Sequence, residues 1–391
     1  MDEVRMVRDA YPEPAPPTAR EIARAKALLA RPPRRTPPRL WWGLGGVVAA
    51  GTAATVSIAL TGGATPGGGS TPAPVRTVRL DYRGAFLAAA DNAERQPTGK
   101  YWYIDTFDGQ SYIIRSKTGT YAITGATSET FSWHGVKRGL GEAYYRRDLP
   151  AHPVGRRDES LWRKAGSPTT FRVWSGDHYD SFTAKGTKWS VDGPSGIDPH
   201  GGGDFLGASA EDLQNLPTDS AELAKKFLNS SQMRKATGFR NGKSLPAPVA
   251  VASLKIHRVA ALVGLSPTPP KVRAGLMRAL AAQPGVHAIG HDTDPLGRRG
   301  VALASDDRPT TVTGEYGGPK AERGTYRWRT VVIFDESTGA LLSVQSELTK
   351  PGGPYSEMKP GFIIDYQADR TSNWTDTKPK PPAALPSFDR P

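Results

Sequence analysis

Histidine and aspartate side chains gather at three places in the chain, and these residue types at short spacing could bind a metal ion or move protons. The three groups are His287, His291, Asp292 and Asp294; Asp198, His200 and Asp204 around three glycines; and Asp177, His178 and Asp180. Pro284-Gly285 and Gly290 indicate strand and turn rather than helix around the first group. We therefore expect hydrogen-bonded turn residues, an adaptable loop and exposed polar residues, respectively. A metal or ion site is the alternative for the first two groups.

Other chemistry is mostly excluded by what the sequence lacks. There is no cysteine in 391 residues, so a disulfide, a thiolate nucleophile and a Cys-bound metal are impossible. No GxSxG elbow, HExxH motif, Walker loop or GxGxxG after a strand occurs. We therefore expect no enzyme and assign no catalytic, cofactor-binding or metal residue. Carboxylates distant in sequence that meet in space would change this expectation.

Aromatic residues offer one further candidate site. Trp102, Trp133 and Trp174 lie in segments rich in aromatic and β-branched residues, which is typical of strands. They could line an apolar ligand cleft. The alternative is that they fill the core.

The clearest segment is the uncharged run from Leu40 to Leu60, which has 21 residues. At about 1.5 Å per residue a helix of this length spans a hydrocarbon core of roughly 30 Å. Trp41 and Trp42 suit the membrane interface. A cleaved signal peptide, with Gly62 and Ala64 at the cleavage site, and a buried soluble helix are the alternatives. The length of the run and the 39-residue leader favour a signal anchor.

Charges beside the run predict its orientation. The 20 residues before it contain seven Lys or Arg, and the 20 residues after it contain only Arg76 and Arg79. Because cationic side chains stay in the cytoplasm, we expect a cytoplasmic N-terminus and an extracytoplasmic C-terminal domain in the cell membrane. Gly46, Ala50 and Ala54 leave one helix face nearly smooth, which permits a weak homodimer through this helix. The alternative is a chance spacing in an Ala- and Gly-rich segment.

Composition divides the chain into five parts. Residues 1–39 form a short basic cytoplasmic segment, in which Thr18 to Ala30 is a helix with a capping box. A single helix of this length cannot build its own core, so this segment is disordered or docks on a cytoplasmic partner. The membrane helix is 40–60, a flexible linker 61–78, the outer domain 79–376 and a Pro-rich tail 377–391. Pro246 to Pro248 is the softest boundary within the outer domain.

The outer domain shows mixed periodicity. Helical spacing is present at 82–96, 220–228, 254–263 and 270–282, and strand-like runs at 100–107, 111–115, 127–133 and 361–367. In the helix expected at 270–282, Val272, Leu276 and Leu280 form an apolar stripe on one face. Residues 330–346 form a hairpin, because Asp335 to Gly339 provide turn chemistry. This order predicts an α+β domain with helices on one face of an antiparallel sheet.

The charge of the outer part bears on its partners. Residues 1–39 carry nine Lys/Arg and five Asp/Glu, which leaves 42 basic and 33 acidic residues of the 51 and 38 in the chain. A body of about +9 beside a membrane should be drawn to anionic lipid headgroups or cell-wall polymers. The basic residues come as scattered pairs, such as Arg156-Arg157 and Arg163-Lys164, rather than as a helix face, so a solvated surface is the favoured interpretation. Nucleic acid is not expected in this compartment.

Three segments carry a resemblance to a known family. Pro269 to Val286, Asp292 to Ala304 and Val331 to Val344 resemble uncharacterised single-pass membrane proteins of actinomycetes, which are often encoded beside extracytoplasmic-function sigma factors. The resemblance implies a membrane-anchored regulatory or sensory protein. By element order the outer domain is also similar to the lipoprotein-carrier fold, a curved sheet closed by helices over an apolar cleft. The 39 cytoplasmic residues are too few for a multi-helix sigma-binding domain.

Two functions follow as hypotheses. The first is an extracytoplasmic regulator or sensor of an unknown envelope ligand or protein, with a cytoplasmic partner at Thr18 to Ala30. The second is a membrane-tethered lipid or lipoprotein carrier.

Overall fold

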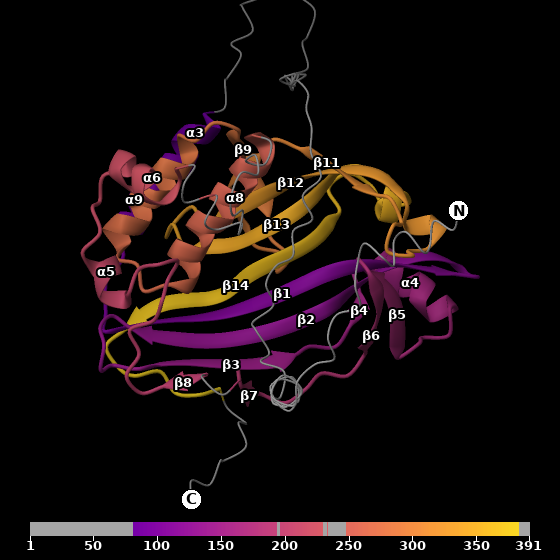
Figure 1. Cartoon of the computed structure of the whole chain (residues 1–391), viewed down its shortest axis with the longest axis horizontal. Helices are drawn as coiled ribbons and strands as arrows, with labels where there is room; N and C mark the ends of the chain where they lie inside the picture. Colours follow the sequence, from indigo (N-terminus) through magenta and orange to yellow (C-terminus); the bar gives the residue numbers. More distant parts are fainter. Residues whose placement is uncertain (1–80, 194–195, 230–232, 234–247, 383–391) are drawn as a thin grey trace, which may run out of the picture. The chain divides into compact units, whose positions relative to one another are not determined.

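The computed structural model describes residues 81–193, 196–229, 233 and 248–382 (Figure 1). The expected helix at Thr18 to Ala30, the run from Leu40 to Leu60, the linker 61–78 and the end of the tail lie outside these residues. Within the described ranges, no helix is both long and apolar enough to cross a membrane.

Most strands form one large antiparallel sheet of twelve strands, in the order β7-β3-β2-β1-β14-β13-β12-β10-β9. Three strands lie off this path: β11 pairs with β12, β4 with β2 and β8 with β3. The strands of this sheet are β1 (Tyr101–Ser116), β2 (Gly119–Gly135), β3 (Glu142–Asp148), β4 (His152–Pro153), β7 (Ser190–Val191), β8 (Ile197–Asp198), β9 (Val286–Thr293), β10 (Arg299–Ser305), β11 (Arg308–Val312), β12 (Gly324–Phe334), β13 (Leu341–Lys350) and β14 (Ile363–Thr375). A separate hairpin is formed by β5 (Thr170–Ser175) and β6 (His178–Thr183). The expected α+β class with a large antiparallel sheet is confirmed.

The helices fall into two groups. Figure 1 shows most of them over the end of the sheet that contains β9, β12 and β13, and α4 at the opposite end beside the β5–β6 hairpin. The described helices are α3 (Tyr82–Glu94), α4 (Arg156–Lys164), α5 (Ala210–Gln214), α6 (Ser220–Phe227), α8 (Pro248–Ala260) and α9 (Pro270–Ala281), with a π-helical turn η1 (Ala261–Leu265) and 3₁₀ turns η2 (Lys320–Glu322) and η3 (Gly353–Tyr355).

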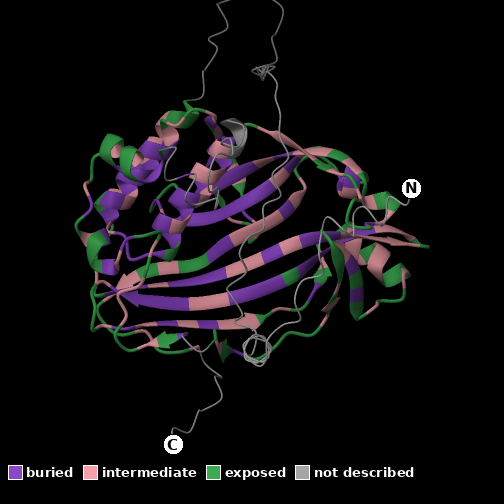
Figure 2. Cartoon of the chain, in the orientation of Figure 1, coloured by how far each residue is buried: buried purple, intermediate pink, exposed green. Residues whose placement is uncertain are grey.

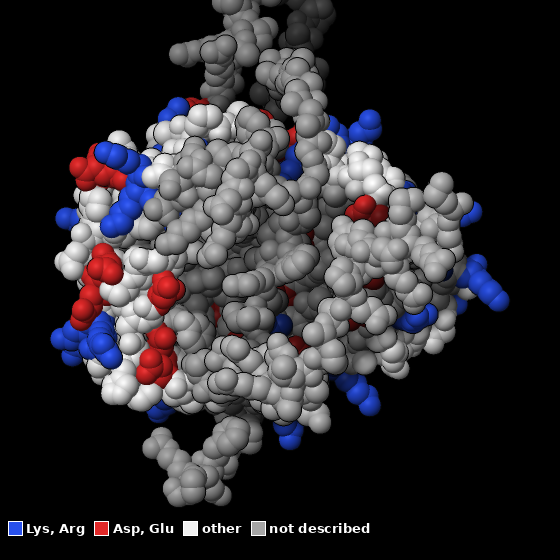
Figure 3. All heavy atoms as spheres, in the orientation of Figure 1, with Lys and Arg blue, Asp and Glu red and all other residues white. Residues whose placement is uncertain are grey.

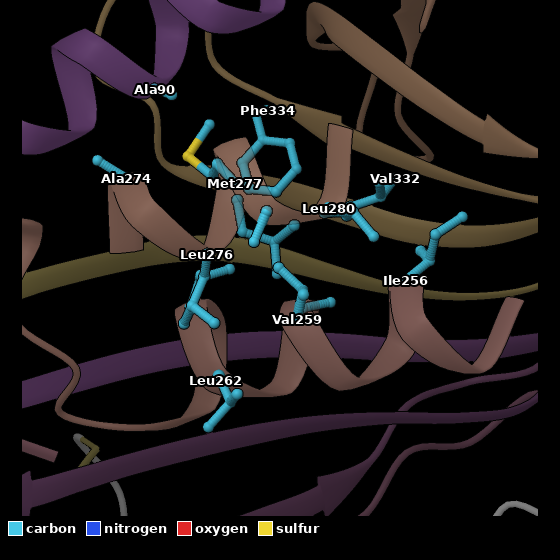
Figure 4. Packing of buried hydrophobic residues seen from close by; sticks show 14 of the residues in the cluster. Ala90, Ile256, Val259, Leu262, Ala274, Leu276, Met277, Leu280, Val332 and Phe334 are labelled. Atoms are coloured by element: carbon cyan, nitrogen blue, oxygen red, sulfur yellow. The ribbon is translucent and has the colours of Figure 1, made fainter. Parts of the chain in front are cut away.

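The main hydrophobic core lies between the first group of helices and the sheet. Leu276 and Leu280 of α9 belong to the stripe that the sequence predicts, and they pack with Val332 and Phe334 of β12 (Figure 4). Phe86 of α3 meets Phe334 edge to face, with ring centroids 5.5 Å apart. This core draws on residues before and after 246–248.

A second, smaller core supports the other end of the sheet. Tyr112 of β1 and Ile123 of β2 pack there with Phe171 and Val173 of β5, and Leu161 of α4 packs against them. Figure 2 shows alternating buried and intermediate residues along β1.

The main difference from the predicted elements is the length of the strands. The runs 100–107 and 111–115 are one strand, β1, although Gly109 lies between them. Gly109 does not end the strand because the ring of Tyr366 fills the space beside it, where a Cβ atom would lie 2.6 Å from Cζ. The predicted hairpin is formed by β12 and β13. In its turn the Asp335 carboxylate accepts hydrogen bonds from the N–H groups of Ser337 (3.0 Å) and Thr338 (2.8 Å).

Candidate functional site

The helix-bearing face of the sheet changes character from strand to strand. Val332 of β12 lies in the main core, and its register partner Val344 of β13 does too. The row continues with Gln367 in β14, Asp108 in β1 and Ser128 in β2. Directly opposed residues of antiparallel strands point to the same face. The same face is therefore apolar on β12 and β13 and polar from β14 onward.

We call this polar part the polar floor. Its residues are Asp365, Gln367 and Asp369 of β14; Thr106, Asp108 and Gln110 of β1; Ser128, Thr130 and Ser132 of β2; and Tyr144 and Arg146 of β3. All of them are buried or half-buried. Along β1 the floor lies between Trp102, which contacts η1, and Tyr112, which belongs to the second core. It is thus bounded at both ends by packed structure.

Three carboxylates occupy neighbouring positions on the polar floor. Asp108 is directly opposite Gln367, so it is diagonal to both Asp365 and Asp369. Diagonal neighbours in an antiparallel pair lie roughly 7–8 Å apart. Among the described residues, no Lys, Arg or His nitrogen comes within 4.0 Å of any of the three carboxylates. The floor therefore contains three desolvated acids that form no ion pair within 4.0 Å in the described part of the chain, although Arg146, Arg308 and Arg298 lie near enough to attract Asp108, Asp365 and Asp369, respectively.

Burial raises the pKa of each of these acids. The pKa of Asp108 rises from 3.8 to about 6 because burial outweighs the attraction of Arg146. Burial also raises the pKa of Asp365 to about 6, against the opposing effects of Ser346 and Arg308. For Asp369 burial raises the pKa to about 7. Since these values lie near neutral pH, the charge of the floor changes in the physiological range.

Asp369 lies where the floor meets the helices. Its Oδ1 accepts a long hydrogen bond from the Thr106 hydroxyl (3.4 Å), whereas its Oδ2 has no hydrogen-bond partner in the described ranges, and the residue is 2% exposed. Gly264 of η1 abuts this carboxylate, because a Cβ atom there would lie 3.0 Å from Oδ2. The Gly264 carbonyl accepts a hydrogen bond from Trp102 Nε1 (2.7 Å). The Arg273 guanidinium lies over the Trp102 ring, 3.4 Å from its centroid.

The three tryptophans proposed for a ligand cleft do not share a surface. Trp102 is on the helix-bearing face, directly opposite His134. Trp133 precedes His134 in the chain and therefore points to the other face of the sheet, where it packs against Tyr101. Trp174 lies in the β5–β6 hairpin. The alternation of side chains along β2 is the physical reason for the separation of Trp102 and Trp133.

The histidine and aspartate groups form local pairs. His287 pairs with Asp306 (2.7 Å) and His291 with Glu336 (2.9 Å). His178 Nδ1 lies 2.6 Å from Asp177 Oδ1, and this hydrogen bond raises the pKa of His178.

The aspartates also cap turns. Asp294 accepts hydrogen bonds from the N–H groups of Leu296 (3.0 Å) and Arg298 (2.7 Å). Asp198 accepts one from the N–H of His200 (2.8 Å). Asp204 accepts one from the N–H of Gly207 (2.6 Å). In the described ranges no group of three or more His, Cys, Asp or Glu residues could hold a metal ion.

The floor carboxylates were not among the candidate residues from the sequence. Asp365 lies inside the strand expected at 361–367, whereas Asp369 lies two residues beyond its expected end. Both belong to β14 in the structure. The spacing of Asp365, Gln367 and Asp369 at every second residue is the available signal, because it places three polar groups on one face of a strand. Their position opposite Asp108 depends on pairing between distant segments.

Comparisons with known proteins add little. No protein-family model and no curated protein matches the chain. Among solved structures, MucB in complex with MucA(peri) aligns with a TM-score of 0.18 and 12% identity, over 75% of this chain and 57% of that chain. The complex of Pseudomonas aeruginosa MucA/MucB aligns with a TM-score of 0.19 and 13% identity, over 75% and 56%. This chain thus spans little more than half the length of either match. Likenesses at these TM-scores carry no argument about fold or function.

Proposed function

We propose that this chain is a membrane-anchored, extracytoplasmic regulatory or sensory protein, and that its polar floor binds the ligand or protein partner. The apolar run from Leu40 to Leu60 and the excess of basic residues before it support the anchor and its orientation. The family resemblance of the sequence supports the regulatory role. The observation that carries the ligand proposal is the set of three floor carboxylates, which lack an ion pair with any described residue.

A cationic group is the chemical complement of such a site. Burial of a carboxylate without a cation disfavours its charged form, and a cation nearby restores that form. An ammonium or guanidinium group placed between Asp108 and Asp365 would lower both pKa values and release protons on binding. The ligand proposed for the floor is therefore a polypeptide segment or small molecule with a basic group.

The alternative hypothesis, a tethered lipid or lipoprotein carrier, finds less support. A carrier needs an apolar surface for hydrocarbon, and polar groups buried against hydrocarbon lose hydrogen bonds to water. The apolar part of the helix-bearing face is filled by side chains of the helices, such as Leu276 and Met277. The remaining part is the polar floor.

Binding to the floor can be tested with a tri-lysine peptide and the full-length protein in detergent. Calorimetry at pH 6.5 in two buffers of different ionisation enthalpy should show binding with proton release. The double variant Asp108→Asn/Asp365→Asn should bind at least about tenfold more weakly, because about 1.4 kcal/mol of lost charge pairing suffices for that factor. The matched control Asp292→Asn/Asp306→Asn changes the half-buried Asp292 of β9 and the exposed Asp306, neither of which belongs to the polar floor, and it should bind as the wild type does. Equal binding by both double variants would refute the ligand proposal.

The anchor has a separate test that uses the absence of cysteine. Thr36→Cys and Ser70→Cys place one thiol on either side of the apolar run. A membrane-impermeant maleimide should label Ser70→Cys in intact cells and label Thr36→Cys only after lysis. The reverse pattern, or release of a shortened protein into the medium, would contradict the proposed topology.

A further inference from the structure

The end of the molecule farthest along the sheet from the main core carries α4, and one side of this helix is fixed to the sheet. Asp158 Oδ1 accepts a hydrogen bond from the N–H of Ala122 in β2 (3.0 Å). Leu161 packs in the second core and contacts the position of Gly119 at the start of β2. Trp162 packs against the same core and donates from Nε1 to the Pro168 carbonyl (3.0 Å). These three side chains define the inner side of α4.

The outer side of α4 is almost entirely cationic. Successive helical residues are separated by about 100°, so positions 156, 160, 163 and 164 fall on the arc opposite Asp158, Leu161 and Trp162, and position 157 lies at one margin of this arc. The exposed residues at these positions are Arg156, Arg157, Ser160, Arg163 and Lys164. Glu159 lies at the margin of this arc and forms an ion pair with Arg163 (2.5 Å). Four cations and one acid leave a net charge of about +3 on the outer side.

The neighbouring surface extends this charge. Lys117 is exposed in the turn between β1 and β2, next to Gly119 and therefore close to Leu161 of α4. Val154, just before α4, is 42% exposed and places an apolar side chain beside the cations. Figure 3 shows Lys and Arg side chains projecting at the end of the molecule at which Figure 1 draws α4. We call Arg156, Arg157, Arg163, Lys164 and Lys117 the α4 basic face.

No ion pair with a described residue involves Arg156, Arg157, Lys164 or Lys117. Within the described ranges, these four side chains are therefore available for contacts outside the domain. Exposed cations in a cluster of this kind are attracted by an extended anionic surface, because each makes a separate favourable contact and no desolvation is required. A cluster of exposed cations beside one exposed apolar residue is also the pattern of a domain that rests on lipid headgroups.

We propose that the α4 basic face docks the outer domain on an anionic lipid surface. The proposal rests on the membrane anchoring proposed above, since a tethered domain is held near lipid at high local concentration. Docking would fix which side of the domain faces the membrane. Under this proposal, the part of the outer domain's positive charge that contacts lipid is the α4 basic face.

The test uses residues 79–382, a segment that contains every residue of the two described cores, so that the anchor cannot contribute. Co-sedimentation compares vesicles of phosphatidylcholine alone with vesicles in which one third of the lipid is phosphatidylglycerol. We expect binding to the anionic vesicles only, and loss of most of it at about 0.5 M salt, where the Debye length falls below about 5 Å. The variant Arg156→Glu/Arg157→Glu/Lys164→Glu should bind at least about tenfold more weakly.

A matched control separates the α4 basic face from net charge. Lys225→Glu/Lys226→Glu/Lys271→Glu changes the charge by the same amount on exposed residues of α6 and α9, and it should bind as the wild type does. Unchanged melting temperatures exclude misfolding of either variant. Equal losses in the two triple variants, equal binding to neutral vesicles, or binding of soluble polyphosphate without binding of anionic vesicles would each overturn the proposal. Because the anchor is missing from this segment, failure here leaves the labelling test of the topology unaffected.

Discussion

The two halves of the helix-bearing face differ in what their side chains do. On β12 and β13 the face is covered by helices and packed with residues such as Val332 and Phe334, which are fully buried. From β14 to β3 the same face carries Asp365, Asp369 and Asp108 instead. We refer to these as the apolar half and the polar floor. Hydrogen bonding between strands runs through both without interruption.

The difference shows how one sheet can separate stability from recognition. In the apolar half every buried methylene contributes about 0.8 kcal/mol of hydrophobic stabilisation. On the polar floor burial of Asp369 acts in the opposite direction, since its raised pKa means that folding disfavours its charged form. A protein keeps such unfavourable groups where a binding partner compensates them. We therefore expect that removal of a buried side chain in the apolar half lowers the free energy of unfolding, whereas removal of a buried charge on the polar floor raises it at high pH.

Phe334→Ala in the apolar half should have the largest effect. The ring is fully buried and meets Phe86 edge to face, so truncation leaves a cavity between α3 and the sheet. We expect a loss of about 3–5 kcal/mol in the free energy of unfolding. Urea unfolding followed by tryptophan fluorescence measures it. Phe334→Leu keeps most of the volume and should lose less than about 1.5 kcal/mol. A loss in the alanine variant below that of the leucine variant would contradict the packing described for this half.

Asp369→Asn on the polar floor should stabilise the protein at high pH. The pKa of Asp369 is raised to about 7 by burial, so the folded state holds the proton more tightly than the unfolded state. Its contribution to stability is complete below pH 3.8 and is lost as the pH rises to about 7. About three pH units correspond to an upper limit of about 4 kcal/mol. Asparagine does not titrate, so the Asp369→Asn variant should not lose this stability as the pH rises.

The measurement is the change in unfolding free energy between pH 4.5 and pH 8 for the wild type and for Asp369→Asn. Any cost of the amide itself is present at both pH values and cancels in the difference. We expect the wild type to lose more stability than the variant over this range. Identical pH profiles would show that Asp369 ionises in the folded protein as it does in the unfolded chain.

Glu129→Ala tests the support behind the polar floor. Glu129 lies on the opposite face of β2, is 0% exposed, and pairs with Arg147 and with Arg370 (2.8 Å). Removal of one partner of a buried ion pair costs about 3–5 kcal/mol, and we expect about 3 because both arginines remain partly exposed. Thr130→Ala changes the next residue, which lies on the polar floor, and should cost less than about 1.5 kcal/mol. Equal losses would remove the distinction between the two faces of this strand.

The sequence predicts the apolar half well because its signals are local. The stripe of Val272, Leu276 and Leu280 lies within three turns of one helix, and it packs on the sheet as expected. The turn from Asp335 to Gly339 is also encoded by adjacent residues. Such patterns need no knowledge of which strands pair.

The polar floor was not predictable in the same way. Thr106 and Asp369 are 263 residues apart in the chain, and only the pairing of β1 with β14 brings them together. The same limit applies to the tryptophans, since the face of Trp133 follows from the register of β2 against β1. Gly109 lies inside β1 rather than at its end, and the ring of Tyr366 that fills the space beside it comes from β14, which the residues around Gly109 do not reveal. Long-range pairing therefore determines the site, whereas local periodicity determines the core.

Gly264→Ala should have the smallest effect, and its sign should depend on pH. Gly264 lies at the boundary of the two halves, where a new Cβ atom would be 2.9 Å from Leu341 Cδ2 and 3.0 Å from Asp369 Oδ2. The end of the leucine side chain can move at little cost, and alanine in a helical turn gains roughly 0.5–1 kcal/mol over glycine. The methyl group also places apolar surface against Asp369 Oδ2, which disfavours the charged form of this carboxylate and raises its pKa further. At pH 4.5 Asp369 is protonated, so only two effects remain. The cost of moving Leu341 and the gain of alanine over glycine should then nearly cancel in the free energy of unfolding.

At pH 8 the same methyl group should destabilise the protein by about 1 kcal/mol, because the ionised carboxylate of Asp369 then has an apolar group against its unpartnered oxygen. Urea unfolding at the two pH values measures the difference. In the background Asp369→Asn the pH dependence should vanish, since no charge remains beside the new methyl group. If the loss of unfolding free energy still depended on pH in that background, the ionisation of another group of the polar floor would have to be affected by the methyl group at position 264. The boundary between the two halves would then extend beyond Asp369.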